Sequence, residues 1–153
     1  MQPKSEISLL DPAPEKSHKS QVMAFTIGGM ILVLAVVLYF ALRYYPEKKA
    51  TAQFFDALVA GDTDKAYELW KPTTSYRKDD FLADWGASGY YGPVKSYKIM
   101  RAKQPNQSDS IAVSVVVSPY SPLPSASDAL KSQKTKEVTL WVSPKDKSLS
   151  FPP

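Results

Sequence analysis

The sequence contains no cysteine and a single histidine, and these two shortages exclude several classes of function. Without cysteine the chain has no disulfide, no thiolate nucleophile, no iron–sulfur cluster and no cysteine zinc site. The one histidine, His18, stands in a polar N-terminal stretch. The rest of the chain therefore has no histidine for general-base catalysis or metal binding, and a Ser-His-Asp triad within one chain is excluded.

Positive charge is present but is not concentrated. The formal net charge is +4, whereas a nucleic-acid-binding face needs clustered lysine and arginine. The longest basic grouping is Lys131, Lys134 and Lys136, which we expect at a solvated strand end. We therefore expect no nucleic-acid partner, and no motif predicts a cofactor.

Charge is missing altogether from one long apolar stretch, Val22 to Leu42 (VMAFTIGGMILVLAVVLYFAL). A helix of this length spans roughly 31 Å, close to the thickness of the hydrocarbon core of a bilayer. Arg43, Tyr44 and Tyr45 follow at once, as residues of a membrane interface do, and Pro46 then ends the helix or begins a new one. A core helix of a small domain would carry a polar stripe, so the sequence predicts a membrane helix over residues 22–45.

An uncleaved anchor fits this stretch better than a signal peptide. Ala50-Thr51-Ala52 has the form of a cleavage site, but the apolar stretch is too long and charged residues precede that site. Lysine and arginine are nearly balanced on the two sides, so they do not fix the orientation. We expect the N-terminus inside and the C-terminal domain outside, because that arrangement is common. In a bacterium this means an inner-membrane protein with a periplasmic domain.

The apolar stretch from Val22 to Leu42 has one patch of small residues and no acidic or basic side chain. Ala24 and Gly28 are four positions apart and Gly29 is adjacent, a spacing that lets another helix approach closely. The alternative is that glycine is simply tolerated in a membrane helix. The absence of acidic and basic side chains excludes a proton or ion pathway through the span. The tail before it, residues 1–21, is polar and proline-containing, and we expect it to be flexible unless a partner orders it.

Residues 47–153 are predicted to form one soluble α+β domain. Ala52, Phe55, Ala57, Leu58 and Val59 follow a helical spacing, Gly61 suits a helix end, and Asp62 or Thr63 can cap a second helix that Pro72 ends. A third helix is expected over KDDFLADW, with Phe81, Leu82 and Trp85 as its apolar side. Alternating strands are expected over residues 94–103, 110–118 and 136–143, with a weak fourth over 148–151. This order predicts about three helices packed on a curved antiparallel sheet of three to four strands.

The stretch FFDALVAGDTDKAYELW, followed by DDFLADWG and then by strands, resembles membrane-anchored bacterial domains of the nuclear-transport-factor-2-like superfamily. The resemblance covers residues 50–143. It implies a cone of helices and a curved sheet, often with a pocket, but no single activity. The chain departs from many relatives at its C-terminus, because Trp141 lies in the expected third strand rather than in a closing strand.

The stretch WGASGYYG, residues 85–92, brings three glycines together. Phosphate loops run from a strand into a helix, whereas here an expected helix ends and a strand follows. We therefore interpret the stretch as a corner, with Gly86 at the helix end and Gly92-Pro93 as the turn into the sheet. Aromatic residues at such corners serve the core, a pocket mouth or a partner surface. The candidates for interface or pocket are Trp70, Trp85, Tyr90, Tyr91, Tyr97 and Trp141.

Carboxylates give no clear catalytic pattern. Asp80 and Asp84 lie four apart beside Asp79, which fits a solvated helix face better than an acid–base pair. Some enzymes of the resembled superfamily use a buried aspartate with a tyrosine, but a pair such as Asp56 with Tyr67 matches no motif. A cofactor-free hydrolase or isomerase therefore has only the resemblance in its favour.

Two further functions remain open on sequence alone. The first, which we favour, is a non-enzymatic accessory or assembly subunit of a larger membrane complex of a respiratory, photosynthetic or transport type. The second is a membrane-anchored domain that binds a small apolar or lipid-like ligand inside the cone. The second face of the sheet, with Ala112, Ser114, Val116 and Trp141, is expected to be a pocket or an interface.

Overall fold

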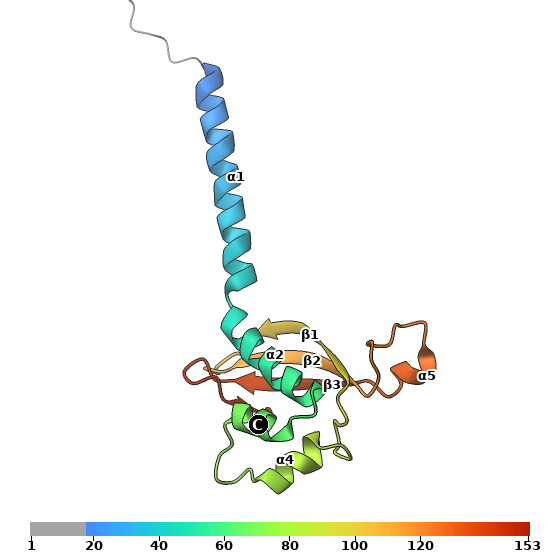
Figure 1. Ribbon diagram of the computed structural model, residues 1–153. Coiled ribbons are helices and arrows are strands. Elements are labelled where there is room, and N and C mark those ends of the chain that lie inside the picture. The colour runs from blue at the N-terminus through green and yellow to red at the C-terminus, as the bar shows by residue number, and fades with distance from the viewer. Residues whose placement is uncertain (1–17) are drawn as a thin grey trace, which may run out of the picture. The chain divides into compact units, whose positions relative to one another are not determined.

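The computed structural model describes residues 18–153, and the chain divides into two units, which meet between Ala41 and Leu42. The described part of the first unit is α1, His18–Leu42, whose last residue already belongs to the second unit (Figure 1). Most of the tail expected over residues 1–21 lies outside the described residues. From Val22 to Leu42 the helix is apolar on all sides, and it is long and apolar enough to cross a membrane. It ends at Leu42, three residues before the expected end, because Arg43 and Tyr44 form a turn and Pro46 stands in the first turn of the next helix.

Three helices open the second unit: α2 (Tyr45–Val59), α3 (Thr63–Trp70) and α4 (Lys78–Trp85). The end of α2 is set by Gly61, whose φ is +78°, a left-handed conformation that glycine adopts at little cost. The amide of Gly61 donates to Leu58 and that of Asp62 to Ala57. Asp62 then caps α3, since its Oδ1 accepts from the amide of Lys65 at 3.0 Å. The predicted helix end and cap are thus confirmed.

The sheet is an open antiparallel meander in the order β1-β2-β3-β4. Its strands are β1 (Ser96–Lys103), β2 (Ile111–Ser118), β3 (Lys136–Val142) and β4 (Leu149–Ser150). The register shifts between Ile99 and Arg101, which marks a β-bulge in β1. All four expected strands are present, and the α+β fold class is confirmed.

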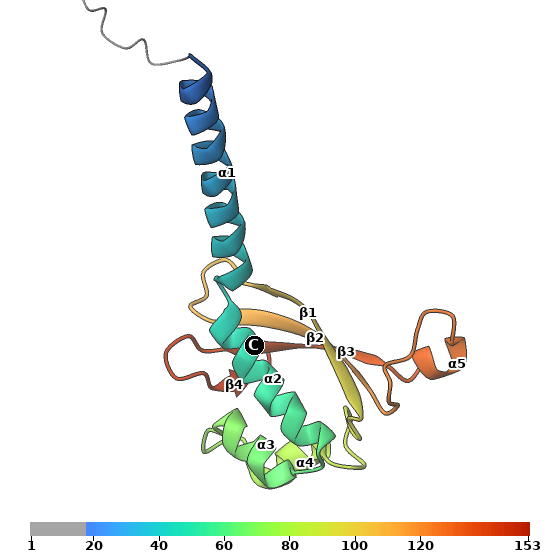
Figure 2. The same ribbon diagram turned by 45° about the horizontal axis from the view of Figure 1, so that its top comes forward.

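Helix α2 lies against β1, β2 and β3, and α3 packs on α2 and α4 (Figures 1 and 2). The core between helices and sheet contains Phe54, Phe55, Phe81 and Leu140, none of which has exposed surface. Two details of the expected helix faces were wrong. Phe54 was not included in the buried face of the first helix, and Leu82, expected on the apolar side of α4, is 38% exposed.

The connection from β2 to β3 is longer than the other turns of the sheet. It contains the proline-rich segment over residues 119–127, as expected, and then one short helix that was not expected, α5 (Ala129–Ser132). Asp128 caps this helix, and none of its residues is buried. Leu130 is 80% exposed, and Figure 1 shows α5 beyond the end of the strands.

Candidate interaction surfaces

The surface of α1 has no partner within the described chain. Every side chain from Val22 to Leu42 is exposed. A Cβ atom placed on Gly28 or Gly29 would meet nothing within 4 Å. The predicted patch of Ala24, Gly28 and Gly29 is therefore open to another helix or to lipid.

The stretch WGASGYYG uses its backbone amides within the corner itself. Tyr90 donates to the carbonyl of Ala83 at 2.8 Å and Tyr91 to that of Asp84 at 2.7 Å. These bonds satisfy carbonyl groups at the end of α4. The glycines are required by close backbone approach, because a Cβ on Gly92 would lie 1.8 Å from the carbonyl oxygen of Gly86. The geometry is that of the predicted corner.

The candidate aromatic residues do not gather at one site. Trp70, Trp85 and Tyr91 belong to one packed cluster. Trp85 is 2% exposed, and its ring centroid lies 5.2 Å from that of Phe54 and 4.8 Å from that of Tyr91. Phe151, near the C-terminus, also belongs to the cluster, and its ring is parallel to that of Trp85 within 2°. The interior of the domain is therefore filled with aromatic side chains around Trp85.

The other three candidates lie elsewhere. Tyr97, on β1, stacks on Phe55 with centroids 5.2 Å apart. Tyr90 is 64% exposed, and the ammonium of Lys136 lies 3.8 Å from the centroid of its ring. Lys136 also donates to the carbonyl of Tyr90. Trp141 is half-buried and belongs to the opposite face of the sheet, described below, so Tyr90 alone of the six candidates is largely exposed.

Two tyrosine–aspartate pairs are present among the described residues, and neither is Asp56 with Tyr67, the pair that matched no motif in the sequence. Asp56 accepts from the hydroxyl of Tyr97 at 2.7 Å, whereas the hydroxyl of Tyr67 donates to the carbonyl of Tyr76. Asp84 accepts from the hydroxyl of Tyr76 at 2.6 Å. Burial, and then the bond to Asp84, raises the pKa of the Tyr76 phenol far above its ordinary value.

Both pairs connect parts of the fold. The Tyr97–Asp56 pair joins β1 to α2, and burial followed by this bond also raises the pKa of Tyr97. The Tyr76–Asp84 pair joins the α3–α4 connection to α4. Phenols held in the protonated form beside carboxylates act as hydrogen-bond donors that fix these elements. Asp80, which the sequence places four positions before Asp84, accepts a hydrogen bond from the amide of Arg77 at the start of α4, at 3.0 Å.

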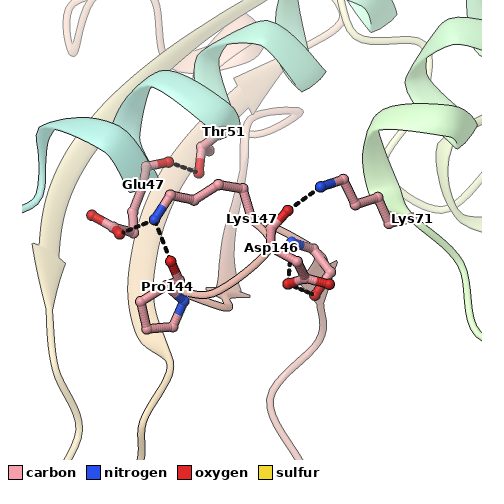
Figure 3. A network of polar contacts seen from close by, with 7 residues as sticks. Glu47, Thr51, Lys71, Pro144, Asp146 and Lys147 are labelled. Atoms are coloured by element: carbon pink, nitrogen blue, oxygen red, sulfur yellow. Dashed lines mark hydrogen bonds and ion pairs between the residues drawn. The ribbon is translucent and has the colours of Figure 1, made fainter.

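A polar network ties the start of α2 to the turn between β3 and β4 (Figure 3). Lys147 Nζ lies 2.8 Å from Glu47 Oε1 and 2.7 Å from the carbonyl oxygen of Pro144. Glu47 is 5% exposed, so its carboxylate depends on this partner. Lys71 donates to the carbonyl of Asp146 in the same turn. Hydrogen bonds from Ser143 and Ser148 lower the pKa of Asp146 to about 2.

Two of the surface hollows lie beside residues discussed above or below. One, of about 330 Å³, is lined by Trp70, Tyr76 and Phe151 together with the residues around Lys71 and Ser148. The other, of about 600 Å³, is polar and lies between Arg43, Tyr44 and the β1–β2 loop over residues 104–109. Among residues 18–153, no group of three or more acidic or histidine side chains is placed to hold a metal ion.

The second face of the sheet is not covered by the helices. Residues paired directly across strands share one face. On the covered face Val113, Val115 and Val117 belong to the core. The other face carries Ala112, Ser114 and Val116 on β2, and register places Trp141 opposite Ala112 and Thr139 opposite Ser114. On β1, the residues paired with Val116, Ser114 and Ala112 are Lys98, Arg101 and Lys103 respectively. The basic side chains were not among the residues predicted for this face.

Comparison with protein-family models, with curated proteins and with solved structures found no match to this chain. The resemblance to the nuclear-transport-factor-2-like superfamily therefore stays a prediction.

Proposed function

We propose that this chain is a single-pass membrane protein whose domain is a non-enzymatic interaction module, an accessory or assembly subunit of a larger membrane complex. The observation that carries the proposal is the surface of α1. Its side chains from Val22 to Leu42 are apolar and exposed on all sides, and such a surface is stable in lipid or against other apolar helices.

The arrangement of the domain supports a binding role rather than catalysis. Trp70 and Trp85 are enclosed in the core, and the two tyrosine–aspartate pairs connect elements of the fold. What remains for a partner is the small-residue patch of α1 and the uncovered face of the sheet. The proposal places the protein in a bacterial inner membrane with the domain on the periplasmic side, in keeping with the superfamily resemblance.

The test is native mass spectrometry of full-length tagged protein, gently extracted from its own membrane. A fixed-stoichiometry species that contains other integral membrane subunits is the expected result. A chain that alkaline carbonate releases from the membrane would refute the anchor. A chain that stays in the membrane but is extracted only alone or as a homodimer would refute the accessory-subunit role.

The hollow beside Trp70, Tyr76 and Phe151 favours a second candidate, binding of a small apolar ligand. Its volume of about 330 Å³ falls in the lower part of the range of small-molecule pockets. The same mass spectra test this candidate, because a bound ligand adds a discrete small mass to the monomer. Substitution Phe151→Ala should then remove that mass.

A further inference from the structure

One end of the uncovered sheet face combines positive charge with an aromatic side chain. Lys103, Ala112 and Trp141 lie in one row across β1, β2 and β3. Arg101 and Ser114 lie in the next row. Ala112 is only 5% exposed although no helix covers this face, as expected if the longer side chains beside it close over it.

The charge of this face is mostly of one sign. The bulge after Ile99 brings Lys98 onto the same face as Arg101 and Lys103. The one carboxylate paired on this face, Glu137, lies opposite Val116, two rows away from Trp141. The Trp141 end of the face is therefore cationic and attractive to anions.

The same end lies beside the beginning of the domain. Arg43 and Tyr44 line one polar hollow together with the β1–β2 loop, which begins at Gln104, directly after Lys103. Only Arg43 and Tyr44 separate α1 from α2, and the neighbouring Tyr45 is 55% exposed. If α1 spans a bilayer, so short a connection holds this end of the domain within reach of the lipid headgroups.

We propose that this end of the domain, formed by Arg43, Tyr45, Arg101, Lys103 and Trp141, binds the phosphate groups of an anionic phospholipid bilayer. The inference rests on the proposed membrane anchor. Arginine and lysine are attracted to an anionic membrane surface, and tyrosine and tryptophan favour the headgroup region because they join an apolar ring to a polar group. Bound in this way, the domain is held in one orientation on the bilayer.

The test uses full-length protein in nanodiscs of phosphatidylcholine, with or without phosphatidylglycerol, that contain a lipid with a spin label on its headgroup. The label quenches the fluorescence of nearby tryptophan. Trp70 and Trp85 are 3% and 2% exposed, so the difference from a Trp141→Phe variant reports Trp141. We expect its quenching to rise with the fraction of phosphatidylglycerol and to fall as salt is added.

The matched variants are Arg101→Gln with Lys103→Gln, and, as the control, Lys131→Gln with Lys134→Gln. Both pairs remove the same charge from exposed positions. The first pair should lower the ratio of bound to unbound domain by roughly tenfold or more, because each cation near an anionic surface contributes about fivefold. The control should leave it unchanged.

The inference is overturned if Trp141 is quenched equally in the two lipid mixtures. It is also overturned if the two variant pairs change the quenching of Trp141 by the same amount. Flotation of the nanodisc-reconstituted protein, run in parallel, separates this result from failure of the anchor. A chain that does not float with lipid refutes the proposed function, whereas a chain that floats without quenching refutes only the headgroup contact.

Discussion

At the scale of single residues, the buried carboxylate of Glu47 needs a cation beside it in the folded state. Its partner, Lys147, comes from a turn one hundred positions later in the chain. Substitution Lys147→Gln keeps most of the side chain but removes the charge, so Glu47 is left buried without a cation. We expect a loss of about 2 kcal/mol in the free energy of unfolding, less than for a fully buried pair because the Lys147 side chain is 33% exposed.

Thermal unfolding in detergent, followed by the fluorescence of the buried tryptophans, measures this loss. The double variant Glu47→Gln with Lys147→Gln should recover much of it, since no buried charge remains. Lys145→Gln, an exposed neighbour in the same turn, is the control. Equal stability of the Lys147 and Lys145 variants would show that Glu47 is solvated and does not depend on Lys147.

Tyr76 predicts how stability depends on pH in the alkaline range. The raised pKa of its phenol, caused first by burial and then by the bond to Asp84, means that the folded state keeps a proton that the unfolded state loses. This contribution is complete below about pH 10, the ordinary value for tyrosine, and is lost as the pH rises above it. Between pH 10 and 11, the free energy of unfolding of Tyr76→Phe should therefore fall by on the order of 1 kcal/mol less than that of the wild type.

Urea unfolding of the two proteins at several alkaline pH values gives the difference in slope directly, because contributions from the other groups cancel. Asp84→Asn should give an intermediate slope, since burial remains while the charged acceptor is removed. Parallel slopes for wild type and Tyr76→Phe would contradict the prediction.

At the scale of elements, the corner over residues 85–92 is held by close backbone contact. A methyl group on Gly92 would overlap the carbonyl oxygen of Gly86, and backbone cannot move away as a flexible side chain can. We expect Gly92→Ala to cost about 3 kcal/mol. Ser88→Ala, at an exposed position in the same corner, should be neutral within about 0.5 kcal/mol. Chemical denaturation of both variants measures the contrast, and similar midpoints would mean that the corner is loosely packed.

The local elements could be predicted because their signals are local. Residues 78–85 form α4 with the bounds of KDDFLADW, and Asp62 caps α3. The face that an element buries was less predictable. Leu82 follows the helical spacing of Phe81 and Trp85, but its side of α4 faces solvent because no other element packs there. Spacing alone does not show how wide the buried face of a short helix is.

The cationic end of the sheet illustrates a second limit. Strict alternation places Lys98 on the face opposite to Arg101 and Lys103. The bulge between Ile99 and Arg101 adds one residue and reverses the alternation, so all three lie on one face. The strand sequence SYKIMRAK contains no glycine or turn motif that would predict the bulge. A surface that depends on such an irregularity is seen only when the register is known.

At the scale of the whole molecule, the long-range partners were also beyond sequence reasoning. No motif in the sequence gave Asp56 a partner, and the sheet brings Tyr97 to it. Glu47 with Lys147 and Phe151 with Trp85 depend on the same global arrangement. The long apolar helix was predictable because its signal, which is composition and length, lies within a single segment.

The proposed anchor gives a prediction about how the whole molecule associates. Within the chain a side chain at Gly28 or Gly29 has open space, so Gly28→Leu should leave insertion and the folded domain intact. If α1 contacts a partner helix through this patch, the added side chain separates the backbones and weakens association by about 1–3 kcal/mol. Thr26→Leu, about 200° around the helix from Gly28, is the matched control. Quantitative co-purification from the native membrane should show a partner yield that falls roughly tenfold for Gly28→Leu. Equal partner yields for the two variants would assign recognition to the domain and leave α1 as an anchor alone.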